Sequence, residues 1–219
     1  MEAFIQRVHR IINICWDSFS AKVGGGLLEV NKEASMQLHF AYLLKNTMDL
    51  ALHHKDEAIV VELETGIKVN GRMRACDIII KMTKAEELRI LPIELKCYKE
   101  YASSGGKRGA IDIFFKDVYA DIELIESYAT VENYINGIQL TMTDFVNVVH
   151  PKVKKGKYFD YDITDGASIK NGVHLQTEIG GKEVDIKIKG SYDFNWKQVG
   201  SYYFLKLMDK DNGGVDIHY

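Results

Sequence analysis

Residues 73–97 read MRACDIIIKMTKAEELRILPIELKC and contain two apolar runs, 73–82 and 88–97. Each run has the length and the β-branched content of a strand. The polar segment between the runs, 83–87, is too short for a crossover connection, so it predicts a turn between antiparallel neighbours. The sequence therefore predicts a β-hairpin, in which charged residues at 77, 94 and 96 lie directly beside the most apolar parts of the two strands.

The flanking segments extend this hairpin into a larger pattern. Residues 57–65 are also strand-like, which predicts a three-stranded meander. The spacing of apolar residues predicts helices over 2–19, from Asn31 onward and over 111–128. A polar loop is expected over 151–170, and further strand-like runs are present at 137–149, 174–179, 183–188 and 201–208. We expect a single α+β, or mixed α/β, domain spanning 1–219, with a central mixed sheet flanked by helices.

Composition excludes several other classes of protein. The chain has 219 residues, of which 46% are hydrophobic and 27% charged, so it is neither disordered nor collagen-like. A formal net charge of −3 argues against a protein that coats nucleic acid by bulk positive charge, although it allows a local basic cleft. No run approaches the roughly 18 apolar residues of a membrane span. The three widely spaced cysteines predict reduced, buried thiols, so we expect a cytoplasmic protein with no membrane partner.

Asp77, Glu94 and Lys96 are the residues that this sequence offers as a possible catalytic site. Because strand side chains alternate between faces, Glu94 and Lys96 share one face, and pairing of the two strands can bring Asp77 opposite Glu94. Adjacent carboxylates repel each other unless a cation lies between them. Mg²⁺, with Mn²⁺ as its expected substitute, suits such a pair because it takes oxygen ligands. The pattern indicates metal-dependent phosphodiester hydrolysis, with a structural ion pair as the alternative interpretation.

Asp77 and the segment IELK at 93–96 resemble the motif of the PD-(D/E)XK nuclease superfamily, which includes most type II restriction endonucleases. The family core has the order αβββαβ, which fits about 31–145 of this chain. Helix 2–19 and the strands within 172–208 would then be additions to a restriction-endonuclease-like core. The chain departs from the motif at Cys76, where the family often has proline.

The resemblance implies a role for each residue of the site. The preceding helix often carries a further acidic residue in this family, and Glu33 matches it, with Gln37 one turn later as a supporting residue. The main-chain carbonyl between the acid and the lysine often contacts the metal, which here is that of Leu95. The implied catalytic residues are Glu33, Asp77, Glu94 and Lys96, and the implied metal ligands are Asp77, Glu94, Leu95 and Glu33.

Basic residues near the motif are candidates for contact with nucleic acid. They lie in and around a glycine-rich loop and in a later lysine cluster, and comprise Lys99, Lys107, Arg108, Lys154 and Lys155. Ordinary solvated loops are the alternative interpretation of both groups. On the later helix, Asp117, Asp121 and Glu123 are expected to face solvent.

The sequence thus predicts a Mg²⁺-dependent DNA endonuclease, of a restriction, defence or phage type. A homodimer is implied by the resemblance, because cutting both strands of DNA commonly takes two active sites. The alternative is a catalytically inactive nucleic-acid-binding protein, or an oligomeric assembly protein, on the same fold.

Overall fold

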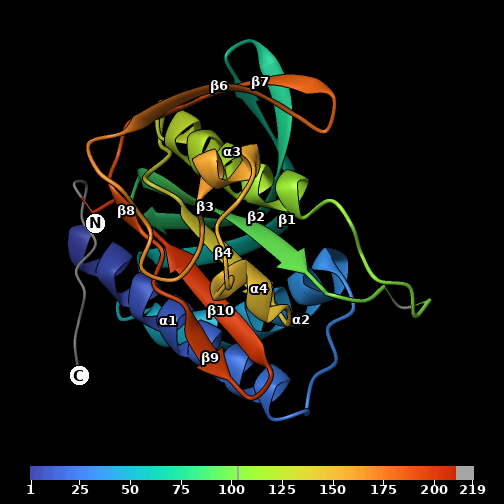
Figure 1. The fold of residues 1–219 in the computed structure, drawn as a ribbon. Helices are drawn as coiled ribbons and strands as arrows, with labels where there is room; N and C mark the ends of the chain where they lie inside the picture. Colours follow the sequence, from blue (N-terminus) through green and yellow to red (C-terminus); the bar gives the residue numbers. More distant parts are fainter. Residues whose placement is uncertain (103, 211–219) are drawn as a thin grey trace.

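A six-stranded mixed sheet forms the centre of the computed structural model, which describes residues 1–102 and 104–210 (Figure 1). The strands are β1 Glu57–Val69, β2 Arg72–Lys84, β3 Glu87–Tyr98, β4 Ile138–Thr143, β5 Ser168–Ile169, β6 Val173–Ile179, β7 Lys182–Ile188, β8 Tyr192–Asp193, β9 Lys197–Val199 and β10 Tyr202–Leu207. The helices are α1 Glu2–Gly24, α2 Glu33–Thr47, α3 Ile111–Tyr128 and the short α4 Val146–Val149, with 3₁₀ turns η1 Met48–Ala51 and η2 Lys157–Tyr161.

The strand order in the central sheet is β1-β2-β3-β4-β10-β9. The first three strands form the predicted antiparallel meander, and β3 and β4 are parallel because α3 connects them. β10 and β9 continue the sheet with antiparallel pairs. The order of elements from α2 to β4 is therefore helix, three strands, helix and strand, and the predicted α+β class with a mixed sheet is confirmed.

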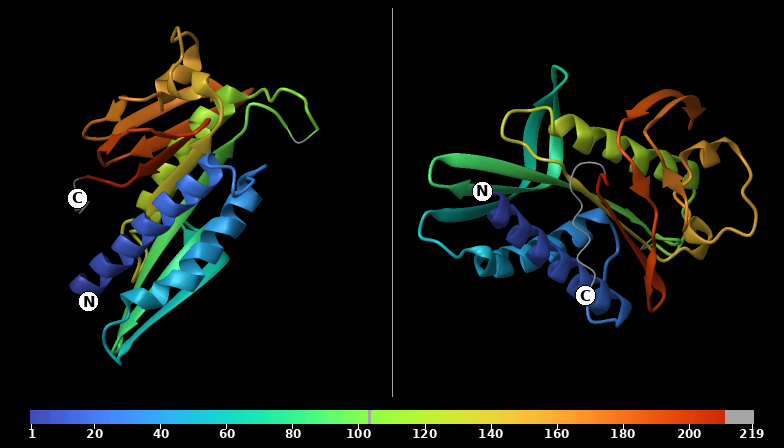
Figure 2. Two further views of the ribbon diagram at one scale, coloured as in Figure 1. Left: turned by 90° about the horizontal axis from the view of Figure 1, so that it is seen from below. Right: turned by 90° about the vertical axis from the view of Figure 1, so that its left-hand side faces the viewer.

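The two faces of the sheet are covered by different elements (Figure 2). α1 and α2 cover one face, where Phe4, Phe19 and Phe40 are fully buried against strand residues such as Leu95 and Leu140. α3 and the strands β5 to β8 cover the other face, in a second apolar cluster. Because side chains alternate along a strand, β3 sends Leu95 toward the first cluster and its neighbours Glu94 and Lys96 toward α3.

Close packing fixes the ends of two elements. Gly24 closes α1 where the β9–β10 turn approaches, and a Cβ atom on Gly24 would lie 2.4 Å from the carbonyl oxygen of Val199. Gly137 precedes β4, and a Cβ atom there would lie 2.8 Å from the carbonyl oxygen of Pro92. Only glycine permits these two approaches of backbone to backbone.

Several predicted boundaries need correction. Helix α2 begins at Glu33 and not at Asn31, because the Ser35 hydroxyl accepts hydrogen bonds from the backbone N–H groups of Asn31 and Lys32. The predicted strand 137–149 is divided into β4 and α4, and the predicted loop 151–170 contains η2 and the whole of β5. The three cysteines are free and buried, as predicted. Among the described residues, no helix is long and apolar enough to cross a membrane.

Candidate active site

The strands β2 and β3 separate at one point, and the candidate site lies in the fork between them. Their paired register runs from Lys84 opposite Glu87 to Ile78 opposite Ile93 and stops there. Beyond this point β2 continues to pair with β1, whereas β3 pairs with β4. The backbone of β3 that faces the fork therefore needs hydrogen-bond partners other than β2.

Two carboxylates supply these partners. Asp77 in β2 accepts a hydrogen bond from the N–H of Leu95, with an Oδ2–N distance of 2.7 Å. Glu33, the first residue of α2, accepts one from the N–H of Cys97, with an Oε2–N distance of 3.4 Å. Backbone N–H and C=O groups of one strand residue point to the same side. The Leu95 carbonyl therefore also faces the fork.

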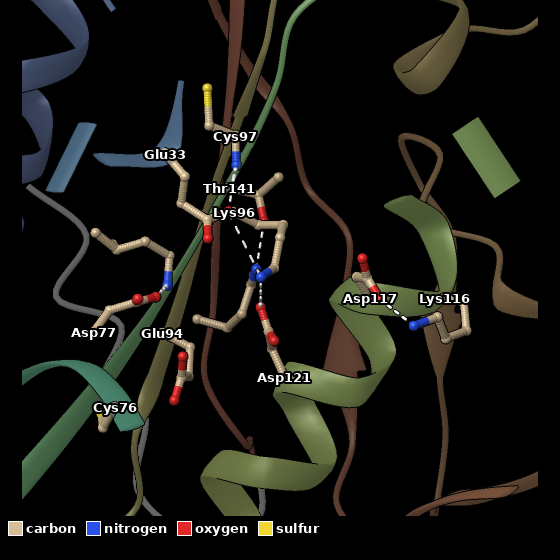
Figure 3. A network of polar contacts seen from close by, with 12 residues as sticks. Glu33, Cys76, Asp77, Glu94, Lys96, Cys97, Lys116, Asp117, Asp121 and Thr141 are labelled. Carbon is tan, nitrogen blue, oxygen red and sulfur yellow. Dashed lines mark hydrogen bonds and ion pairs between the residues drawn. The ribbon is translucent and has the colours of Figure 1, made fainter. Parts of the chain in front are cut away.

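Lys96 lies between α2 and α3 (Figure 3). Its Nζ atom is 3.6 Å from Oε2 of Glu33 and 3.3 Å from Oδ2 of Asp121. Asp121 is only 8% exposed, so the prediction that it faces solvent is wrong. It follows Phe114 and Val118 on the apolar stripe of α3, at the spacing of three and four that buries a helix face. That spacing is the sequence signal that identifies Asp121 as an inward-facing residue.

Glu94 occupies the deepest position of the site and is 5% exposed. Its Oε1 atom accepts a hydrogen bond of 2.9 Å from the hydroxyl of Tyr128 at the end of α3. Its neighbour on β4 is Gln139, which is fully buried and donates through Nε2 to Thr141. The Gln139 Oε1 atom accepts no hydrogen bond from the described residues. A buried acceptor without a donor is unfavourable, so this part of the site favours a bound cation, water or proton.

Burial raises the pKa of all four carboxyl groups around Lys96. The pKa of Glu94 rises to about 9, through burial and then the charges of Asp121 and Asp77. Burial raises the pKa of Asp121 to about 7, and it raises the pKa values of Glu33 and Asp77 as well. Burial alone would lower the pKa of Lys96, but the surrounding carboxylates outweigh it and raise that pKa. One lysine cannot neutralise the two buried carboxyl groups, Glu94 and Asp121, together with the partly exposed Glu33 and Asp77, so additional positive charge would favour their ionised forms.

Gln37 stands one turn after Glu33 and connects α2 to the hairpin. Its Nε2 atom donates to the carbonyl oxygen of Asp77 at 2.9 Å and to Oε1 of Glu64 at 2.7 Å. Glu64 lies in β1 between Leu63 and Thr65, which pair with Ile78 and Cys76 on either side of Asp77. Its φ of 51° is in the left-handed region that most residues avoid. The contact of Gln37 with the Asp77 carbonyl fixes the backbone that carries Asp77. Glu64 was not predicted, because nothing in the sequence signals its backbone conformation.

The donors in the fork are of the kind that Mg²⁺ prefers, although they do not form a closed metal cage. Among the described residues, no group of three or more His, Cys, Asp or Glu side chains has the arrangement of a metal cluster. Mg²⁺ is commonly held by one or two carboxylates with waters and substrate phosphates as the other ligands. Asp77 and Glu94, with the unpartnered Gln139 oxygen nearby, fit that open type of site.

The predicted basic residues near the motif already have partners within the chain. Lys99 forms an ion pair with Asp144, with an Nζ–Oδ2 distance of 2.8 Å, and its ammonium group lies 4.3 Å from the centre of the Tyr202 ring. Lys107 pairs with Glu100 at 3.1 Å and remains 60% exposed. The guanidinium group of Arg108 donates to the carbonyl oxygen of Asn31 at 3.3 Å, beside the start of α2.

The later lysine cluster lies apart from these contacts along the chain. Lys154 forms an ion pair with Asp162 at 2.6 Å, and Lys155 is exposed. The structure brings Glu33, Gln37, Asp77, Glu94 and Lys96 together, and it adds Asp121, Tyr128, Gln139 and Glu64.

Comparisons of this chain with protein-family models, with curated proteins and with solved structures found no match.

Proposed function

We propose that this protein is a Mg²⁺-dependent endonuclease that hydrolyses phosphodiester bonds of DNA, with Mn²⁺ able to replace Mg²⁺. The observation that carries the proposal is the fork, where four carboxyl groups surround Lys96 and burial raises the pKa of each. An excess of buried carboxylate over ammonium is costly in a purely structural cluster. A divalent cation offsets that excess charge.

Asp77 and Glu94 would hold the cation, with the Leu95 carbonyl and Glu33 beside them. These groups offer only oxygen, which suits a hard cation such as Mg²⁺. When bound, the ion would lower the pKa of a coordinated water and stabilise negative charge on a phosphate oxygen. The hydrogen bonds from the N–H of Leu95 and from Tyr128 would keep one oxygen of each carboxylate fixed and leave the other for the ion.

Lys96 would stabilise the charge that develops on the phosphate. Its ammonium group is held from two sides, by Glu33 at the mouth of the fork and by Asp121 within the structure. A cation that is already held in place needs little reorganisation during the reaction, which is where most electrostatic catalysis arises.

The order of elements supports the same proposal. From α2 to β4 the chain follows the order αβββαβ, and Asp77, Glu94 and Lys96 lie on adjacent strands of that unit. We propose on this basis a restriction-endonuclease-like core, a restriction, defence or phage role, and a homodimer as the form that cuts both strands. The basic loop with Lys107 and Arg108 would line the approach to the fork.

A catalytically inactive nucleic-acid-binding or assembly protein on the same fold is the second candidate. The ion pairs of Lys96 with Glu33 and Asp121 favour it, because they give the lysine a structural role. Incubation with plasmid, single-stranded DNA and RNA in Mg²⁺, Mn²⁺ or EDTA separates the candidates. The nuclease proposal expects cleavage of DNA that EDTA and Asp77→Ala or Lys96→Ala abolish. Intact substrates in both metals would contradict it, and a gel shift without cleavage would favour the second candidate.

A further inference from the structure

The end of the β1–β2 hairpin extends beyond the fork as an arm, which we define as residues 66–75. Its sequence, GIKVNGRMRA, contains the three cations Lys68, Arg72 and Arg74, and it contains no acidic and no aromatic residue. The arm projects beyond the central sheet, in teal in Figure 1 and in the right-hand view of Figure 2. A chain with a net charge of −3 therefore concentrates positive charge at one protruding element.

The arm is rigid at its tip. Val69 pairs with Arg72 across a two-residue turn formed by Asn70 and Gly71. These two residues have φ angles of 49° and 77°, which are those of a tight hairpin turn that matches the twist of the strands. The cations on either side of the turn are therefore held by paired strands.

The arm is also anchored to the candidate site. Ile67 and Val69 are 2% and 5% exposed, and they pack in one apolar cluster with Ile125 and Tyr128 of α3. Tyr128 is the residue whose hydroxyl donates to Glu94. The same side chain thus holds the arm and the deepest carboxylate of the fork, so the distance between the arm and the fork is fixed by packing.

The three cations are exposed and have no partner within the described part of the chain. None of them forms an ion pair or a side-chain hydrogen bond there, in contrast to Lys99, which Asp144 neutralises. The apolar side chain of Met73, which stands between the two arginines in the sequence, packs over Gly66. A Cβ atom on Gly66 would lie only 2.8 Å from the Met73 Cε atom, so the glycine leaves space for the methionine.

We propose that the arm binds the sugar–phosphate backbone of a DNA duplex on one side of the fork. Cations without aromatic residues suit phosphates, whereas proteins that hold single strands stack bases on aromatic side chains. Arg74 and Arg72 precede Asp77 by three and five residues, so they lie about 10 to 17 Å from it along the strand. At one phosphate per roughly 3.4 Å of duplex axis, the arm contacts the backbone about three to five nucleotides from the phosphate in the fork. This inference rests on the proposed function for its substrate.

The test compares two variants with equal loss of charge. The arm variant carries Lys68→Gln, Arg72→Gln and Arg74→Gln. The control variant carries Arg10→Gln, Lys45→Gln and Lys55→Gln, three exposed residues of α1, α2 and the turn before β1. Binding of a 30-base-pair duplex, a single strand and an RNA duplex is measured by fluorescence anisotropy in EDTA over a range of salt concentrations, after thermal denaturation shows that both variants fold.

We expect the arm variant to lose roughly 100-fold in duplex affinity near 0.1 M salt. We also expect the plot of the logarithm of the association constant against the logarithm of salt concentration to become shallower, by about 2 to 3 in slope. The control variant should bind as the original chain does. Equal affinity and slope in the arm variant, loss confined to the single strand or to RNA, or no duplex binding by the original chain would overturn the inference. Because EDTA prevents cleavage, arm-dependent binding without nuclease activity in Mg²⁺ would contradict the proposed function alone. If the arm variant still cleaves DNA and still binds the duplex, the DNA-binding role of the arm is contradicted and the proposed nuclease function is not.

Discussion

Lys96 in β3 and Asp121 in α3 form an ion pair with an Nζ–Oδ2 distance of 3.3 Å. Asp121 is buried, whereas the side chain of Glu33, the second partner of Lys96, is 40% exposed. The buried partner holds the ammonium group from within the fold, and the partly exposed partner holds it from the solvent side. Asp121 therefore acts in this account as a positioning residue for Lys96.

Replacement of Asp121 by asparagine tests this role. Asp121→Asn keeps the shape of the side chain and removes the charge that holds Lys96, so we expect the rate of DNA cleavage at saturating substrate to fall about 10- to 100-fold, as for other supporting residues. The KM for DNA should change little, because Asp121 is buried away from the substrate. Plasmid cleavage kinetics measure both quantities.

Asp117 provides the matched control on the same helix. It lies one turn earlier, is more exposed and pairs with Lys116. Asp117→Asn should cleave at the original rate. A normal turnover rate in Asp121→Asn, or an equal loss in both variants, would remove the positioning role from Asp121.

Stability should depend on pH through Glu94. The pKa of Glu94 rises from 4.5 to about 9 on folding, so between these pH values the folded chain binds a proton that the unfolded chain has lost. Stability therefore falls as the pH rises through this range, by on the order of 4 kcal/mol between pH 5 and pH 8. Urea denaturation in EDTA at pH 5 and pH 8 measures the change, and Mg²⁺ should restore stability at pH 8 more than at pH 5.

Two glutamine variants make this measurement specific. Glu94→Gln should reduce the pH dependence in EDTA to the part that the remaining raised carboxyl groups, chiefly Asp121, contribute, and it should abolish the effect of Mg²⁺. Glu86→Gln, in the exposed turn between β2 and β3, should behave as the original chain. An unchanged pH profile in Glu94→Gln would show that Glu94 is not the group that titrates.

Gln37 should matter through the backbone of Asp77. Gln37→Ala removes the hydrogen bonds to the Asp77 carbonyl and to Glu64. We expect a loss of about 1 to 2 kcal/mol in the free energy of unfolding and weaker apparent affinity for Mg²⁺ in cleavage assays. Gln6→Ala, on the exposed side of α1, is the control. Wild-type stability and metal dependence in Gln37→Ala would contradict this role.

Much of the fold could be predicted because the apolar pattern is locally consistent. Helix α3 has the predicted bounds, and the hairpin of β2 and β3 forms where two apolar runs flank a short polar turn. The predicted apolar residues of α1, such as Phe4, Val8 and Phe19, are buried. Periodicity works in these elements because burial of one face is what holds each of them in place.

The site was harder to predict because it depends on where pairing stops. Asp77, Glu94 and Lys96 could be assigned to strands, but the end of the β2–β3 register at Ile78 and Ile93 has no local signal. The inward position of Asp121 was missed because a charged residue on an apolar stripe is usually exposed. Its burial depends on an ion pair with Lys96, which lies on a different element and far from it in the sequence.

The most direct measurement is the rate at which the purified chain opens a covalently closed plasmid in Mg²⁺. We expect nicked and linear products with the original chain and with Glu86→Gln. We expect none above background in EDTA, and a loss of at least about 100-fold in Asp77→Asn, because a metal ligand is removed. Cleavage at the original rate by Asp77→Asn, or cleavage that persists in EDTA, would contradict the claim that the fork is a metal-dependent nuclease centre.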